Sequence, residues 1–192
     1  MSHIVFPLSI LSSARLWAFL QRVDEAEAAR LHLRPCPHCG AGRLHKADWR
    51  RNPAGLAVPL RGEIRRFGLC CGSCRRRVKP ASVRFFCRRR RVAPVFLAAC
   101  LAALARGARL SAVARRLNIP LQTLRRWRDW WREEFPGTGE WRALRAELPP
   151  APDAEPLVRL VGAMRGRSLR SRLLRSLLRL RPGGGGSCTI SA

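Results

Sequence analysis

The stretch SAVARRLNIPLQTLRRWRDWWREE, residues 111–134, decides the fold that we expect for this chain. Val113 and Leu117 are four residues apart, so they share one face of a first helix. Leu124 and Trp127 are three residues apart, so they share one face of a second helix. Two short amphipathic helices in succession predict a helix-turn-helix, in which each apolar face packs on the other.

The residues around these two helices complete a three-helix unit over residues 92–135. Asn118 tolerates the left-handed backbone of a tight turn, and Pro120 then favours the start of a new helix. An apolar segment at residues 95–106 predicts a preceding helix, and Ser111 is expected to cap the one that follows it. The unit therefore has its own apolar core.

The second helix of the pair carries polar side chains opposite its apolar face. We expect Gln122, Arg125 and Arg126 to contact base edges, because Arg pairs with guanine and Gln pairs with adenine in the major groove. Trp130 and Trp131 are expected to lie in the core or at an interface. Four more arginines are better placed for phosphates: Arg115, Arg116, Arg128 and Arg132.

Four of the eight cysteines fall in two Cys-x-x-Cys turns, at residues 36–39 and 71–74. Each turn directs two thiolates at one point, and two turns supply the tetrahedral four-sulfur shell that Zn²⁺ favours. The full shell leaves no open position for water, so the role expected of the metal is structural. We predict a zinc ribbon over residues 31–91, with strands near 43–49, 65–69 and 82–87. Its predicted ligands are Cys36, Cys39, Cys71 and Cys74.

Some alternatives stay open at this point. Cys70 in place of Cys71 would give a longer Cys-x-x-x-Cys spacing, and the paired cysteines would otherwise be coincidental or redox-active. His38 and His45 are expected to face solvent or to support the ligands rather than bind the metal.

The charge of the chain points to a polyanionic partner. Lys and Arg number 38 against 12 Asp and Glu, which gives a net charge of +26. Such a surface suits DNA, RNA or an anionic membrane. The run Arg88, Arg89, Arg90 and Arg91 is either a solvated charge run or a set of phosphate contacts, and we favour the second interpretation.

The two ends of the chain are expected to be helical. Residues 9–30 predict an amphipathic helix rather than a secretory signal, and no apolar stretch has the length of a membrane span. We therefore expect a cytoplasmic protein that does not bind membranes, with reduced thiols. A linker at 136–156, with a short helix at 140–147, leads to a basic amphipathic helix at 157–182 and a disordered tail at 183–192. The apolar stripe of that last helix suits packing on the body, dimerisation, or contact with nucleic acid or a membrane surface.

The order of the two motifs resembles a known family. CPHCG and CCGSCRRR, followed by GARLSAVARRLNIPLQTLRRW, are similar to DNA-binding proteins and amino-terminal regions of bacterial insertion-sequence transposases. The likeness covers about residues 31–135. It implies that the four cysteines bind zinc, that Gln122, Arg125 and Arg126 lie on the DNA-reading helix, and that the ends of a mobile element are the target. The long ribbon loop, the amino-terminal helix and everything after residue 136 depart from the family.

These observations predict a mainly α fold with a small β zinc ribbon: an amino-terminal helix (1–30), the ribbon (31–91), the helix-turn-helix (92–135) and the basic helix. The expected function is binding of DNA, at mobile-element ends or an operator, without catalysis. A homodimer and a separate transposase catalytic subunit are further candidate partners, and the nucleoid of a bacterial cytoplasm is the expected location. The alternatives are a competent or truncated transposase, which would need carboxylates and Mg²⁺, and a basic RNA-binding protein.

Overall fold

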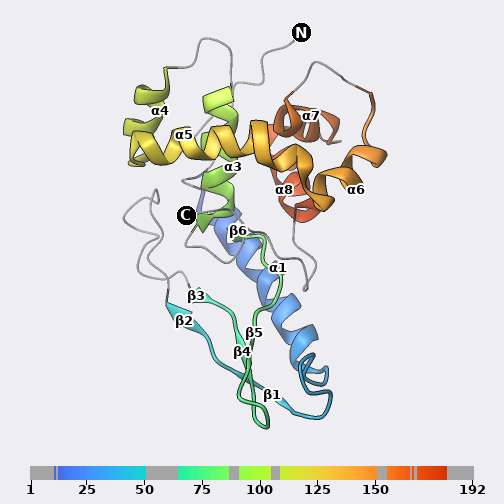
Figure 1. Ribbon diagram of the computed structural model, residues 1–192. Helices are drawn as coiled ribbons and strands as arrows, with labels where there is room; N and C mark the ends of the chain where they lie inside the picture. The colour runs from blue at the N-terminus through green and yellow to red at the C-terminus, as the bar shows by residue number, and fades with distance from the viewer. Residues whose placement is uncertain are drawn as a thin grey trace.

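The computed structural model describes residues 11, 13–50, 65–86, 91–104, 109–150, 155–164, 166 and 168–180. Within these ranges the chain is mainly helical and carries a small antiparallel sheet, so the expected fold class is confirmed (Figure 1). The helices are α1 (Ala14–His32), α3 (Ala93–Leu104), α4 (Leu110–Leu117), α5 (Leu121–Asp129), a π-helix η2 (Trp130–Glu134), a 3₁₀ turn η3 (Phe135–Gly137), α6 (Gly139–Glu147), α7 (Pro156–Ala163) and α8 (Leu169–Arg179).

The strands are short and form three antiparallel groups. β1 (Leu44–Lys46), β4 (Leu69–Cys71) and β5 (Arg77–Val78) make a sheet in the order β1-β4-β5. β2 (Trp49–Arg50) pairs with β3 (Arg65–Arg66), and β6 (Phe85–Phe86) pairs with β7 (Arg91–Val92). Strands therefore occur in all three expected regions, and β5 and β7 were not predicted. The loop expected at residues 51–55 lies outside the described residues.

Helix α1 connects two hydrophobic cores. Its first turns place Leu16 and Leu20 in the main core, which also contains residues of α3 to α8. Its last turn packs Leu31 against the ribbon core, which Leu44, Leu69 and Val78 form with two cysteines. Figure 1 shows α1 leaving the helical body and running beside the β1-β4-β5 sheet. The helix begins at Ala14, where the Ser13 side chain caps the amide of Leu16, and residues 9, 10 and 12 of the expected helix lie outside the described residues.

A buried ion pair fixes α1 to the last part of the ribbon segment, residues 82–84. Asp24 and Arg84 are each 3% exposed, and the Arg84 Nε donates to Asp24 Oδ2 at 2.8 Å. The Ser82 hydroxyl donates to the same oxygen at 2.6 Å, and the Val83 amide donates to Oδ1 at 2.7 Å. The other arm of Arg84 donates to the Arg65 carbonyl. Arg84, which lies shortly before the arginine run at residues 88–91, is therefore a structural residue and not a surface cation.

The single helix expected at residues 157–182 is wrong, because the structure has two helices there. α7 ends at Ala163 and α8 begins at Leu169, and between them Gly166 has a φ of +155°. The Ser168 side chain caps the start of α8. The apolar stripe has a spacing of five residues from Met164 to Leu169, so two helices that fold back on each other bury it better than one straight helix. Leu160, Leu173 and Leu177 join the main core, which supports packing on the body.

The expected linker at 136–156 is partly helical and packed. The short helix predicted at 140–147 is confirmed as α6, and its Trp141 and Leu144 belong to the main core. Trp130 and Trp131 are buried as expected, with ring centroids 4.9 Å apart. The tail expected at 183–192 lies outside the described residues. None of the helices that the structure describes has the length and hydropathy of a membrane span.

Candidate metal centre and nucleic-acid interface

The four cysteines predicted as ligands come together at the end of the β1-β4-β5 sheet. Their sulfur atoms all lie within 4.8 Å of one another. The Sγ atoms of Cys36 and Cys74 are 3.7 Å apart, as are those of Cys39 and Cys71. A Zn–S bond of about 2.3 Å in a tetrahedral shell requires sulfurs about 3.8 Å apart, whereas a disulfide requires about 2.05 Å. The spacing fits four ligands of one ion and excludes two disulfides.

Backbone geometry in both turns presents the sulfurs to one point. Gly40 and Arg75 have positive φ angles of 75° and 59°, at equivalent places after each Cys-x-x-Cys turn. The His38 amide donates to the Cys36 sulfur, and the Cys74 amide donates to the Cys71 sulfur, each at 3.4 Å. Such amide donors stabilise thiolates, which are the form that binds a metal. The two turns are therefore built alike.

A glycine that the sequence pattern did not identify makes room for the sulfurs. A Cβ atom at Gly42 would lie 2.1 Å from the Cys71 Sγ and 3.1 Å from the Ser73 hydroxyl oxygen. No side chain fits at that distance without moving the sulfur. Gly42 lies outside both Cys-x-x-Cys turns, and only the pairing of the turns in space shows why it is glycine.

The pKa values of the thiols differ within the cluster. The Cys74 amide, as the largest cause, lowers the pKa of Cys71 to about 6. For Cys74 the Arg76 amide lowers the pKa, but burial and the neighbouring thiols of Cys71 and Cys36 outweigh it and raise the pKa to about 11. Four thiolates in one place repel one another, so the cluster needs a bound cation to hold all four in that form.

The alternative ligand Cys70 points away from the cluster. Its thiol lies 3.5 Å from the Arg75 carbonyl oxygen, as a donor, and the four-sulfur group contains Cys71 instead. In the strand register, Cys70 lies opposite His45 of β1 and Arg77 of β5, on the exposed face of the sheet. Leu44 and Cys71 lie opposite each other on the buried face. His38 and His45 are exposed and outside the group of candidate ligands.

At the other candidate site, α3, α4 and α5 pack against one another as a three-helix unit. The turn between α4 and α5 has Asn118 at φ 51° and ψ 47°, so the left-handed residue is where the sequence predicted it. The Ile119 amide donates to the Ala114 carbonyl and the Asn118 amide to the Arg115 carbonyl, which together end α4. The expected cap at Ser111 is wrong: α4 begins at Leu110, with Arg109 as its N-cap and no capping side chain.

Helix α5 has one buried face and one exposed face. Leu124 and Trp127 are 0% and 4% exposed in the main core. Gln122, Arg125 and Arg126, the predicted base-contacting residues, are all exposed. Arg125 and Arg126 follow Gln122 by three and four residues, so the three side chains lie on one side of the helix. The arrangement presents two cations and an amide to solvent on a helix that packing holds in place.

The predicted phosphate-contacting arginines fall into three groups. Arg115 and Arg116 are exposed on α4, and the structure gives neither an ion pair within its described ranges. Arg128 pairs with Asp129, and Arg132 with Glu155, each at 2.8 Å, so these two cations are partly neutralised. The run 88–90 lies outside the described residues, and of Arg91 only the backbone, in β7, is described.

Together these features define a class of protein: a helix-turn-helix protein with a separate four-cysteine site of metal-binding geometry. Residues 97–138 match the family model of the homeodomain-like domain, which supports a DNA-binding role for α3, α4 and α5. The matched segment begins inside α3 and ends after η3, so the cysteine site lies outside it. No curated protein and no solved structure matches this chain.

Proposed function

We propose that this chain is a DNA-binding protein of the transposase-associated type, which binds mobile-element ends or an operator and has no catalytic activity of its own. The observation that carries the proposal is the exposed face of α5, within a segment that matches a homeodomain-like domain. In such domains the last helix of the unit lies in the major groove. Gln122, Arg125 and Arg126 would then read base edges, each good bidentate contact discriminating by about 1–3 kcal/mol.

Phosphate contacts would set the position of α5 in the groove. Arg115 and Arg116 lie at the end of α4, next to the turn that leads into α5. In the helix-turn-helix arrangement the first helix crosses the DNA backbone, so its exposed cations meet phosphates. These contacts would bind all sequences alike and would weaken as salt increases.

The metal would be a structural Zn²⁺ held by the four cysteines. The donor set supports this proposal because four thiolates fill a tetrahedral shell and leave no position for substrate. A single iron accepts the same ligands, so the metal content has to be measured. The bound ion would hold the two turns together and stabilise the ribbon, whose own core is small.

The carboxylates support binding rather than strand cleavage. Cutting and joining DNA with Mg²⁺ requires acidic side chains that are free to hold the ions. In the described ranges Asp24, Glu27, Asp129, Glu147 and Glu155 each pair with an arginine. Glu25 and Asp48 accept hydrogen bonds from Gln21 and Gly68, which leaves the exposed neighbours Glu133 and Glu134 on η2, outside any βαβ-type fold. A separate catalytic subunit would then supply the chemistry, in the cytoplasm where the element lies.

Substitutions on α5 test the proposal. Arg125→Ala and Arg126→Ala are expected to weaken specific duplex binding about 5- to 100-fold and to weaken nonspecific binding much less, because base contacts are lost. Arg116→Ala is expected to weaken both alike and to reduce the slope of log affinity against log salt by about one. Fluorescence anisotropy with labelled duplexes at several salt concentrations measures both effects.

Arg142→Ala is the matched control, because Arg142 is exposed on α6 and outside the homeodomain-like segment. If Arg125→Ala, Arg116→Ala and Arg142→Ala behave alike, α5 does not read DNA. Equal competition by RNA at fixed salt would favour the RNA-binding alternative, and Mg²⁺-dependent nicking of the bound duplex would show a transposase.

A further inference from the structure

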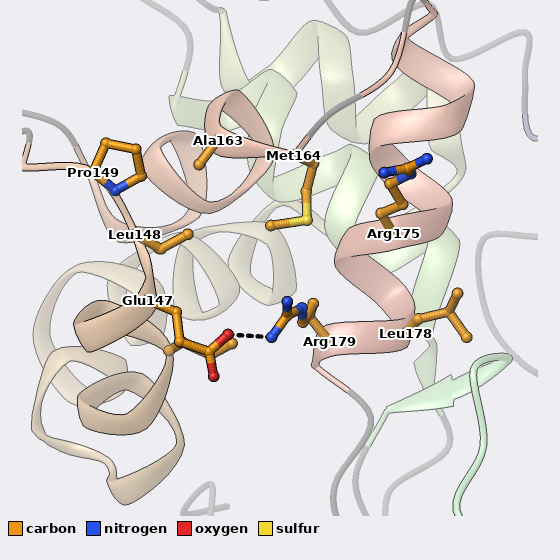
Figure 2. A pocket seen from close by; sticks show the side chains of 9 residues that line it. Glu147, Leu148, Pro149, Ala163, Met164, Arg175, Leu178 and Arg179 are labelled. Carbon is orange, nitrogen blue, oxygen red and sulfur yellow. Dashed lines mark hydrogen bonds and ion pairs between the residues drawn. The ribbon is translucent and has the colours of Figure 1, made fainter.

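A pocket of about 730 Å³ lies among α6, α7 and α8, away from both sites described above (Figure 2). Its apolar lining comes from the end of α6 and the end of α7, including Leu144, Leu148 and Met164. Figure 2 shows the Met164 side chain reaching from the end of α7 into the space between α6 and α8. The volume falls in the range of about 300–1,000 Å³ that small-molecule sites have.

The charged lining comes from two of the three helices, α6 and α8. Arg175 and Arg179 come from successive turns of α8, four residues apart, and Glu147 comes from α6. Glu147 and Arg179 form an ion pair between the two helices (Figure 2). Arg175 is exposed and has no acidic partner among the residues that the structure describes. The lining of the pocket therefore contains two arginines and one glutamate, and the charge of Arg175 is not neutralised by an acidic side chain of the lining.

Exposed apolar surface continues from the pocket along α8. Leu178 lines the pocket and is 44% exposed, which makes it one of three large apolar side chains exposed in the described ranges. It comes from α8, directly before Arg179. An occupant that contacts Leu178 and Met164 and reaches Arg175 would need an apolar body and an anionic group.

We propose that this pocket binds a small anionic amphiphile, a carboxylate on an apolar chain or ring. The apolar body would contact Leu148, Met164 and Leu178, and the carboxylate would accept hydrogen bonds from Arg175. A planar guanidinium matches a carboxylate in two-point geometry, and such charge-assisted bonds are among the stronger ones in proteins. This proposal does not depend on DNA binding.

The charge argues against a second copy of the chain as the occupant. Each copy carries +26, and the open edge of the pocket is itself cationic, so two copies would repel each other there. An acidic amphipathic peptide would satisfy the same chemistry in part. The lining is small, however, and the ion pair between Glu147 and Arg179 spans the space that a passing helix would need.

Calorimetric titration of the full-length, metal-loaded protein with decanoate, at physiological salt and below its micelle concentration, tests the proposal. We expect one decanoate per chain, about tenfold weaker binding to Arg175→Gln, and only partial recovery of the affinity in Arg175→Lys, which keeps the charge but loses the two-point geometry. Arg142→Gln on α6 removes the same charge outside the pocket and is expected to bind as the unchanged protein does. Acetate, which lacks the apolar body, should not compete.

Several outcomes would overturn the proposal. Equal binding of decyltrimethylammonium would show that the site does not select an anion, and equal losses in Arg175→Gln and Arg142→Gln would show nonspecific attraction to a cationic protein. Saturable binding of an acidic amphipathic peptide without binding of decanoate would assign the pocket to a protein partner. Absence of any binding by the folded protein, with its thermal unfolding unchanged by decanoate, would also refute it.

Discussion

Replacing Cys71 by serine is expected to release the metal and to unfold the ribbon. Cys71 is fully buried, and its sulfur lies 3.7 Å from that of Cys39. Among the described residues, no fifth side chain belongs to the group of candidate ligands and could replace it. A structural zinc contributes on the order of 10 kcal/mol, and the ribbon core has few apolar residues to replace that energy. Elemental analysis of the purified protein should give one metal per chain before the substitution and much less than one after it.

Cys70→Ser is the matched control for this experiment. The two cysteines are neighbours in β4, but the Cys70 thiol faces the exposed side of the sheet and is not in the four-sulfur group. The control should keep its metal and its unfolding temperature. Equal metal content in Cys71→Ser and Cys70→Ser would disprove the ligand assignment, and iron in place of zinc would correct the identity of the ion.

Asp24→Ala is expected to lower the free energy of unfolding by about 3–5 kcal/mol, since it leaves the Arg84 guanidinium buried without its counter-ion. It also removes the acceptor of the Ser82 hydroxyl and the Val83 amide. Glu25→Ala is the control, because Glu25 is exposed and, among the described residues, accepts a hydrogen bond only from the Gln21 side chain. Denaturation by urea, followed by tryptophan fluorescence, measures both variants.

The double variant Asp24→Leu, Arg84→Met separates the charge from the packing. Replacing both members of a buried pair with apolar residues of similar volume is often neutral, whereas removal of one member is costly. We expect the double variant to recover most of the stability that Asp24→Ala loses. An Asp24→Ala protein as stable as Glu25→Ala would show that the pair does not hold α1 to the ribbon.

Local patterns in the sequence were enough to predict the helix-turn-helix and the cysteine pairs. The spacing of Leu124 and Trp127 defines a helix face by itself, and Asn118 adopts the left-handed turn that its side chain tolerates. The two Cys-x-x-Cys turns share one geometry because each is determined by a few neighbouring residues. In these cases the information lies within a few residues of the chain.

Contacts between distant residues were not predictable in the same way. Asp24 and Arg84 are 60 residues apart, and Arg84 looks like any other member of an arginine-rich segment until the fold buries it. Gly42 is explained only by the sulfur of Cys71 from the other turn. The reversal of the chain at Gly166 depends on both α7 and α8 packing on the main core, which the wider spacing in the apolar stripe does not predict by itself.

Selection of duplex DNA from a random pool by the metal-loaded protein tests the central claim most directly. Our account predicts that one sequence is enriched. Replacing Gln122, Arg125 or Arg126 by alanine should abolish the preference for particular base pairs within that sequence. Substitution of Arg116 should leave the preferred sequence unchanged. A pool that stays random after repeated rounds, although the protein is folded and loaded with metal, would contradict sequence reading by α5.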